Sequence, residues 1–153
     1  MPVSVFKGHT AEVQSCEWSH LNKTHFLSAS MDGTVKIWQP NSMVPLNSFA
    51  HGQTVNQAIW HPTHESIFAS CSADQFCRVW DTRSGKDVKK IHAHTNDILS
   101  IDFNKYENFI ATSSTDNLIK IFDLRANMDQ PLMMLMGHQL AVRKIKFSPY
   151  HAN

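Results

Sequence analysis

The sequence has little of what many enzymes and membrane proteins need. It contains no GxSxG elbow, no phosphate-binding P-loop and no GxGxxG turn. No apolar run is long enough to cross a bilayer, and the opening MPVSVFKGHT lacks the apolar segment of a secretory leader. The net charge is only +1, which gives no bulk electrostatic reason to expect a nucleic acid or membrane partner. We therefore expect neither nucleic-acid binding nor direct membrane insertion.

Cysteine is also scarce. The three cysteines form no CxxC pair, and they are Cys16, Cys71 and Cys77. All three lie in stretches of strand character, so we interpret them as small buried residues of a protein in a reducing compartment. Two histidine pairs, His61 with His64 and His92 with His94, have spacings that could suit a metal, but no carboxylate or cysteine completes a ligand set nearby. We expect neither a metal nor a cofactor.

What the sequence does contain is a repeat. Near copies of one segment read SASMDGTVKIWQ from Ser28, SCSADQFCRVWD from Ser70 and TSSTDNLIKIFD from Thr112. Each copy has a strand, an Asp at a tight turn and an alternating strand that ends on an aromatic, which is the pattern of a β-hairpin. The turn aspartates are 42 residues apart in both steps, and a small residue followed by His recurs at steps of 42, 43 and 44. This period, with two landmarks in phase, predicts the four-stranded blades of a β-propeller.

We predict an all-β fold in which residues 1–153 belong to one partial propeller. Complete blades are expected at 13–49, 55–92 and 98–136, with strands of partial blades at 3–6 and 142–148. Propellers close on themselves with typically about four to eight blades. Three blades with two ragged ends do not close a ring, so we expect a propeller fragment.

The aromatic, the Asp, the His and a hydroxyl recur together, which predicts one hydrogen-bonded chain of side chains in each blade. The indole N–H is expected to donate to the hydroxyl, the hydroxyl to the imidazole, and the imidazole to the carboxylate. The sets are His9, Ser28, Asp32 and Trp38; His51, Ser70, Asp74 and Trp80; His94, Thr112, Asp116 and Phe122; and His138 at the start of a fourth. Phe122 has no N–H, so the third chain is one donor short. Because the set recurs in every blade, we interpret it as structural rather than as the triad of a hydrolase.

The loops that enter the inner strands and the Asp turns are expected on one rim of the propeller. The residues three past each landmark His and those just before each turn Asp are Glu12, Met31, Thr54, Ala73, Asp97, Thr115 and Ala141. Glu12 and Asp97 put a carboxylate at the same offset in two blades. Our hypothesis is that they receive basic side chains of a peptide, whose apolar residues contact the small or apolar neighbours. The alternative is that both are solvated loop acids.

Blade by blade, the chain resembles the WD-repeat family over its whole length. Three segments outside the general landmarks are similar to the family of receptors for the type 2 peroxisomal targeting signal. They are LMGHQLAVRKIKFSPYHAN from Leu135 to Asn153, HAHTNDILSIDFNKYENFIATSSTDN from His92, and Asp123-Leu124-Arg125. The resemblance covers only the middle blades of such a receptor.

This resemblance implies a non-enzymatic import receptor that shuttles between the cytosol and the peroxisome matrix. It implies as partners the N-terminal signal of peroxisomal matrix cargo, with a basic residue and spaced apolar residues, and a co-receptor that docks at the peroxisomal membrane. The alternative is a generic WD-repeat scaffold or substrate adaptor in a protein complex. An enzyme that uses Glu12, Asp97 or Glu107 is a weaker alternative, because no matched acid and base or activated nucleophile accompanies them.

Overall fold

The computed structural model describes residues 4–126 and 130–150, and every regular element within those ranges is a β-strand. The strands are β1 Val13–Trp18, β2 Phe26–Ser30, β3 Thr34–Trp38, β4 Asn47–Ala50, β5 Val55–Trp60, β6 Ile67–Ser72, β7 Phe76–Asp81, β8 Lys86–His92, β9 Ile98–Phe103, β10 Phe109–Ser114, β11 Ile119–Asp123 and β12 Met133–Leu135. No helix among these residues is long and apolar enough to cross a membrane.

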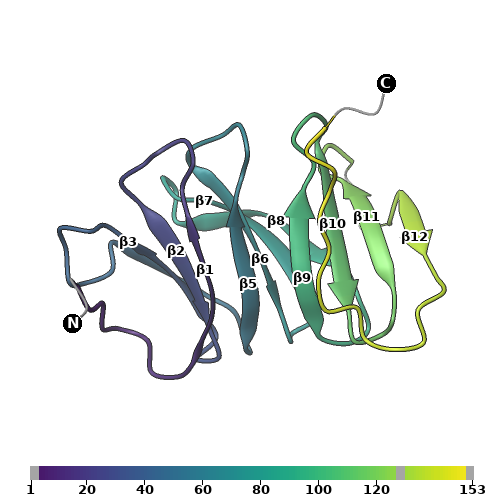
Figure 1. The fold of residues 1–153 in the computed structure, drawn as a ribbon, viewed down its shortest axis with the longest axis horizontal. Coiled ribbons are helices and arrows are strands. Elements are labelled where there is room, and N and C mark those ends of the chain that lie inside the picture. Colours follow the sequence, from purple (N-terminus) through teal and green to yellow (C-terminus); the bar gives the residue numbers. More distant parts are fainter. Residues whose placement is uncertain (1–3, 127–129, 151–153) are drawn as a thin grey trace.

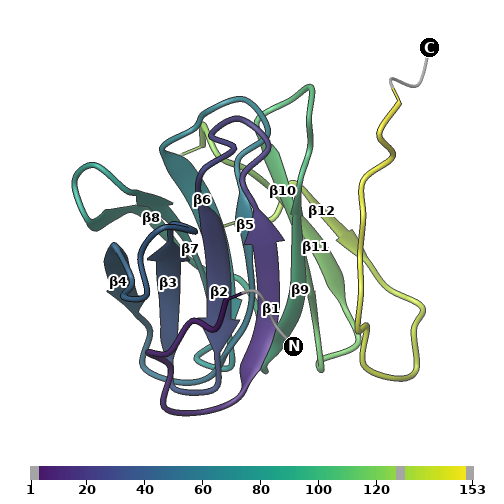
Figure 2. The same ribbon diagram turned by 60° about the vertical axis from the view of Figure 1, so that its left-hand side comes forward.

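The strands form three separate antiparallel sheets of four strands each. Their orders are β1-β2-β3-β4, β5-β6-β7-β8 and β12-β11-β10-β9, and we call these sheets blades 1, 2 and 3. The blades stand side by side along the chain (Figures 1 and 2), and Figure 1 shows β5 of the middle blade between β1 and β9. Each sheet is a simple meander, because the tight turns leave no room for a crossover. The prediction of all-β propeller blades is confirmed.

The repeated Asp shapes the central hairpin of each blade. Asp32, Asp74 and Asp116 each accept through Oδ1 the backbone N–H two residues later, at 3.0, 3.1 and 3.1 Å. The residue in between has a positive φ in every blade, namely Gly33 at 80°, Gln75 at 72° and Asn117 at 68°. The side-chain bond stabilises this turn, so it forms even where no glycine is present. The same turn therefore recurs three times with three different residues at its left-handed position.

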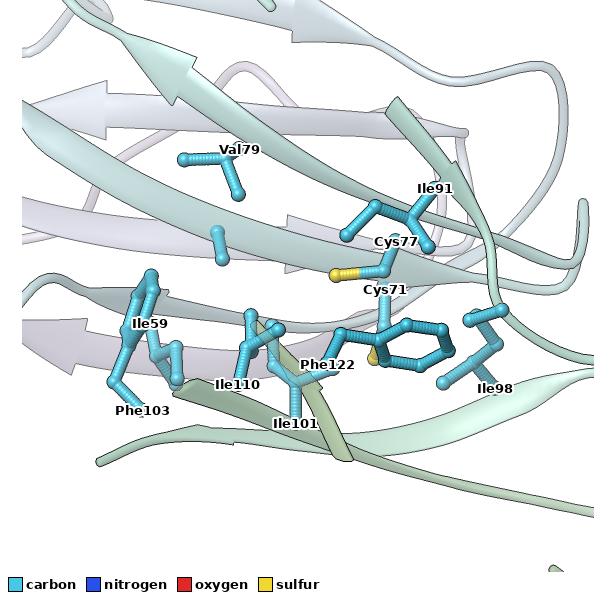
Figure 3. Close-up of a cluster of buried hydrophobic side chains, with 12 residues drawn as sticks. Ile59, Cys71, Cys77, Val79, Ile91, Ile98, Ile101, Phe103, Ile110 and Phe122 are labelled. Atoms are coloured by element: carbon cyan, nitrogen blue, oxygen red, sulfur yellow. The ribbon is translucent and has the colours of Figure 1, made fainter. Parts of the chain in front are cut away.

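The hydrophobic cores lie between the blades. Leu27 and Val35 of blade 1 are fully buried in one cluster with Phe68 of blade 2. A second cluster joins blades 2 and 3 and includes Cys71 and Phe122, as Figure 3 shows. Burial of each large side chain contributes about 1.5–3 kcal/mol. A blade therefore depends for its stability on the neighbour that covers its face.

The first strand of each blade is its inner strand, namely β1, β5 and β9. Side chains of an inner strand also bond to the backbone of the next inner strand or, after β9, of residues 142–148. Glu17 of β1 accepts the N–H of Trp60 on β5 at 2.6 Å, and Gln57 of β5 accepts the N–H of Ile101 on β9 at 3.1 Å. Asp102 of β9 in turn accepts the N–H of Phe147 at 2.7 Å. In all three bonds the acceptor lies in the earlier blade and the N–H in the next segment along the chain. We call this set the inner-strand bonds.

The segments expected as strands of partial blades are not strands in the structure. Val3 lies outside the described residues, and residues 4–6 and 142–148 have no strand assignment. Phe6 instead packs edge-on against Phe26, with ring centroids 5.0 Å apart, and residues 142–148 run beside β9. Strand geometry needs a hydrogen-bonded neighbour on the same sheet, and the described residues supply none to either segment.

Cys16 differs from the prediction of three buried cysteines. Cys71 and Cys77 are buried, but Cys16 is exposed on the face of blade 1. Its repeat equivalents Ala58 and Ile101 are 1% and 0% exposed because a preceding blade covers them. The residue at this repeat position is therefore buried only where a preceding blade covers it.

Candidate functional site

In blade 1 the repeated polar side chains form one continuous hydrogen-bonded chain. The Trp38 indole N–H donates to Ser28 Oγ at 2.7 Å, and Ser28 Oγ lies 2.6 Å from His9 Nε2. The other ring nitrogen of His9, Nδ1, donates to Asp32 at 2.8 Å. This chain ties the loop before β1 to the hairpin of β2 and β3, and so fixes the rim at the Asp turn.

Blade 2 has the same chain with one addition. Trp80 donates to Ser70 at 2.8 Å, and Ser70 Oγ lies 2.6 Å from His51 Nε2. The separation of His51 Nδ1 from Asp74 is longer, 3.3 Å, because the guanidinium of Arg78 lies against both and donates to Asp74 at 2.6 Å. The role of Arg78 was not predicted from the sequence, because the other two blades have a lysine at this position and those lysines contact other groups. A departure from lysine at this repeat position was the signal that could have found it.

Blade 3 has a shorter chain. His94 Nε2 lies 2.9 Å from Thr112 Oγ1, and His94 Nδ1 donates to Asp116 at 2.9 Å. Phe122 is 2% exposed and offers no N–H, so Thr112 lacks the indole donor that the hydroxyls of the other blades receive. Thr112 remains hydrogen-bonded, with a further contact to the Lys120 carbonyl at 3.4 Å. His138 is exposed, with no Asp turn of its own among residues 4–126 and 130–150.

Burial and the hydrogen bonds set the charge states of these groups. Burial lowers the pKa of His51 and of His94, although the bonded aspartates act in the opposite direction. For Asp32, burial would raise the pKa, but hydrogen bonds from Thr34 and His9 outweigh it and hold the value well below the usual range. The pKa of Asp116 is lowered in the same way, against burial, by His94. Each chain is thus built from an ionised carboxylate and, in blades 2 and 3, a neutral imidazole at pH 7.

These Ser, His and Asp groups are closed to a substrate. Ser28 is 4% exposed and Ser70 is 0% exposed, and each hydroxyl already receives an indole N–H. An attacking hydroxyl needs an open face toward the carbonyl that it attacks. The chains therefore hold the blades together and shape the rim.

The expected rim residues meet in pairs within each blade. The backbone N–H before each turn Asp donates to the carbonyl three residues past the landmark His: Met31 to Glu12 at 2.9 Å, Ala73 to Thr54 at 2.9 Å and Thr115 to Asp97 at 3.0 Å. Glu12, Met31 and Asp97 are exposed, and Thr54, Ala73, Thr115 and Ala141 are half-buried. The paired backbones fix where the two exposed carboxylates leave the rim. Ala141 follows this order only in sequence, because no Asp turn follows it among the described residues. The next residue, Val142, donates to the Ser114 carbonyl of blade 3 at 3.1 Å.

These features define a propeller-type repeat protein: four-stranded meander blades, hairpins closed by an Asp turn, and in each blade a hydrogen-bonded hydroxyl, His and Asp, joined by a Trp in blades 1 and 2. Its rim is a surface built from loops. The sequence model of the family described as WD domain, G-beta repeat, matches residues 1–39, 43–81 and 85–123. The chain belongs to this family.

Individual relatives of the chain extend the comparison. The peroxisomal targeting signal 2 receptor of Mus musculus is 58% identical over 154 residues, which cover 99% of this chain and 48% of the relative. The receptor of the same name from Homo sapiens is 57% identical over the same shares. That of Saccharomyces cerevisiae is 51% identical over 39 residues, which cover 26% of this chain and 10% of the relative. The chain therefore spans about half the length of the mouse and human relatives.

Proposed function

We propose that this chain takes part in peroxisomal protein import by binding the type 2 targeting signal of matrix proteins. The observation that carries this proposal is the identity of 57–58% along 99% of the chain to receptors named for that signal. Identity at this level extends well beyond the landmark residues that all WD repeats share. It therefore supports a likeness in what the rim recognises as well as in the fold.

The rim chemistry supports the same proposal. Glu12 and Asp97 are exposed acids in two different blades, with Met31 exposed in the first. A signal with a basic residue and spaced apolar side chains would meet carboxylates and apolar surface on this rim. We assign Glu12 and Asp97 as the acceptors of its basic side chains, with Met31, Thr54, Ala73, Thr115 and Ala141 beside them.

The partners and location follow from this function. We infer that the chain works by binding rather than by catalysis, together with an import co-receptor and the docking machinery of the peroxisomal membrane. Such a receptor would meet its cargo in the cytosol and release it in the peroxisome matrix.

The test is a fluorescence anisotropy titration of a labelled type 2 signal peptide. The titrated proteins are the chain itself and a chimera in which it replaces the matching region of the mouse receptor. Each change from acid to lysine, Glu12→Lys or Asp97→Lys, is expected to weaken binding about fivefold, or about 1 kcal/mol, and added salt is expected to weaken it further.

The matched control is Glu107→Lys, which makes the same charge change in the β9–β10 loop, at the opposite ends of the strands. It is expected to leave the affinity unchanged. If all three variants bind equally well, the rim assignment is wrong. If the folded chimera does not bind the peptide even with the co-receptor present, the receptor function fails and a generic scaffold is the better description.

A further inference from the structure

Two equivalent cavities lie between neighbouring blades, at the strand ends opposite the Asp turns. One, between blades 1 and 2, has a volume of about 190 Å³, and the other, between blades 2 and 3, has a volume of about 310 Å³. Their walls use the same repeat positions: Leu46, just before β4, and Arg83 line the smaller cavity, and Val88 of β8 and Arg125 line the larger one. The smaller cavity is thus an internal reference for the larger.

The larger cavity has the more apolar lining. Where the smaller one has His25 and Thr82, the larger one has Ile67 and Leu124. Val88 at its mouth is 59% exposed. An exposed aliphatic wall over an apolar floor is suited to an apolar side chain from outside.

The charge at the mouth also differs between the two cavities. Glu65 lines the smaller cavity, whereas its repeat equivalent Glu107 acts on Arg125 but is not among the described residues that line the larger one, none of which is acidic. Lys89, in the repeat position of Asn47, lines the larger cavity and donates through Nζ to the carbonyls of Leu124, at 3.0 Å, and Ala126. Two bonds to neutral carbonyls fix the ammonium group in place without neutralising its charge.

A second cation stands beside Lys89. The Arg125 side chain is 65% exposed, and its Nε and Nη2 both donate to Asp123 at 3.0 Å, which fixes the plane of the guanidinium. Asp123 balances the charge of Arg125, so Lys89 supplies the net positive charge. His61 adds none, because burial, together with nearby His64, lowers its pKa to about 4.

We propose that the cavity between blades 2 and 3 binds a segment of a partner protein in which an apolar side chain lies next to a carboxylate. The apolar side chain enters between Ile67, Val88 and Leu124, and the carboxylate pairs with Lys89. Electrostatic complementarity of this kind selects acidic over neutral or basic segments. This surface lies at the strand ends opposite the proposed signal-binding rim, so both could be occupied at once.

The probe is the peptide Ac-Asp-Leu-Phe-Asp-Leu-NH2, titrated to millimolar concentration into ¹⁵N-labelled chain and followed by NMR. Saturable shifts are expected at backbone amides around Val88 and Leu124. The same peptide with Asn in place of Asp should bind about fivefold more weakly. In Lys89→Met, which keeps the aliphatic stem, the two peptides should bind equally.

Two matched variants separate this cavity from its reference. Val88→Asp is expected to abolish binding, whereas Leu46→Asp, at the equivalent wall of the smaller cavity, should leave it unchanged. Both residues are largely exposed, at 59% and 45%, so both variants should keep the fold, which circular dichroism checks. Equal binding of the Asp and Asn peptides, equal loss in the two variants, or no saturable shift at all would overturn the proposal. Signal binding by Val88→Asp should stay intact, so failure here is distinguishable from failure of the receptor function.

Discussion

The hydroxyl at the centre of each hydrogen-bonded chain of side chains is the most direct place to test what stabilises a blade. Ser28 bonds to two buried partners, the Trp38 indole N–H and His9 Nε2, at 2.7 and 2.6 Å. Ser28→Ala leaves both without a partner. Each buried polar group left unpaired costs about 1–3 kcal/mol, so the expected loss of unfolding free energy for the two groups is about 2–6 kcal/mol.

Blade 3 offers a built-in comparison. Thr112 bonds to His94 but receives no indole N–H, because Phe122 occupies that position. Thr112→Val, which keeps the shape of the side chain, leaves one buried group unpaired and is expected to cost about 1–3 kcal/mol. Urea unfolding followed by circular dichroism measures both variants, with the exposed Ser48→Ala as a control expected within about 0.5 kcal/mol of the unchanged chain. A loss in Ser28→Ala no larger than in Thr112→Val would refute the reasoning.

Two further predictions concern the burial of side chains in blades 1 and 2. Burial raises the pKa of Glu17 above its ordinary value near 4.5, although the Trp60 N–H lowers it. Protonation of the Glu17 carboxyl therefore contributes its full stability below about pH 4.5, and this contribution is lost as the pH rises through the pKa of Glu17 in the folded chain. Glu17→Gln is expected to flatten that part of the curve of unfolding free energy against pH. Parallel curves for the two proteins would contradict the assignment. Ellman's reagent is expected to titrate one thiol per native chain, Cys16, and three after denaturation, since Cys71 and Cys77 are buried. Rapid reaction of two or more thiols in the native chain would show that blade 2 opens.

The blades were predictable because their signals lie within one repeat. An Asp that accepts the N–H two residues later makes the same turn in all three blades, so the spacing of Asp32, Asp74 and Asp116 alone located the hairpins. The positions of His9, Ser28 and Trp38 followed from the same period, because residues at a fixed offset in a meander occupy the same place on the sheet.

Contacts between repeats were not predictable in this way. The bond from Trp60 to Glu17 depends on how one sheet twists against the next. Within blade 2, the placement of Arg78 between Asp74 and His51 depends on a side chain that differs from blade to blade. The exposure of Cys16 and the missing strands at 4–6 and 142–148 have a common cause. Local sequence gives a segment strand character, but a neighbouring strand or blade decides whether it pairs and becomes buried.

The inner-strand bonds also bear on assembly during synthesis, because each side-chain acceptor precedes its backbone partner in the chain. Glu17, Gln57 and Asp102 are acceptors that leave the ribosome before the N–H groups they bind. Residues nearer the N-terminus emerge first during synthesis. Each acceptor can therefore bond the next inner segment as soon as that segment is translated, so the cover on which the earlier blade depends begins to form before the following blade is complete.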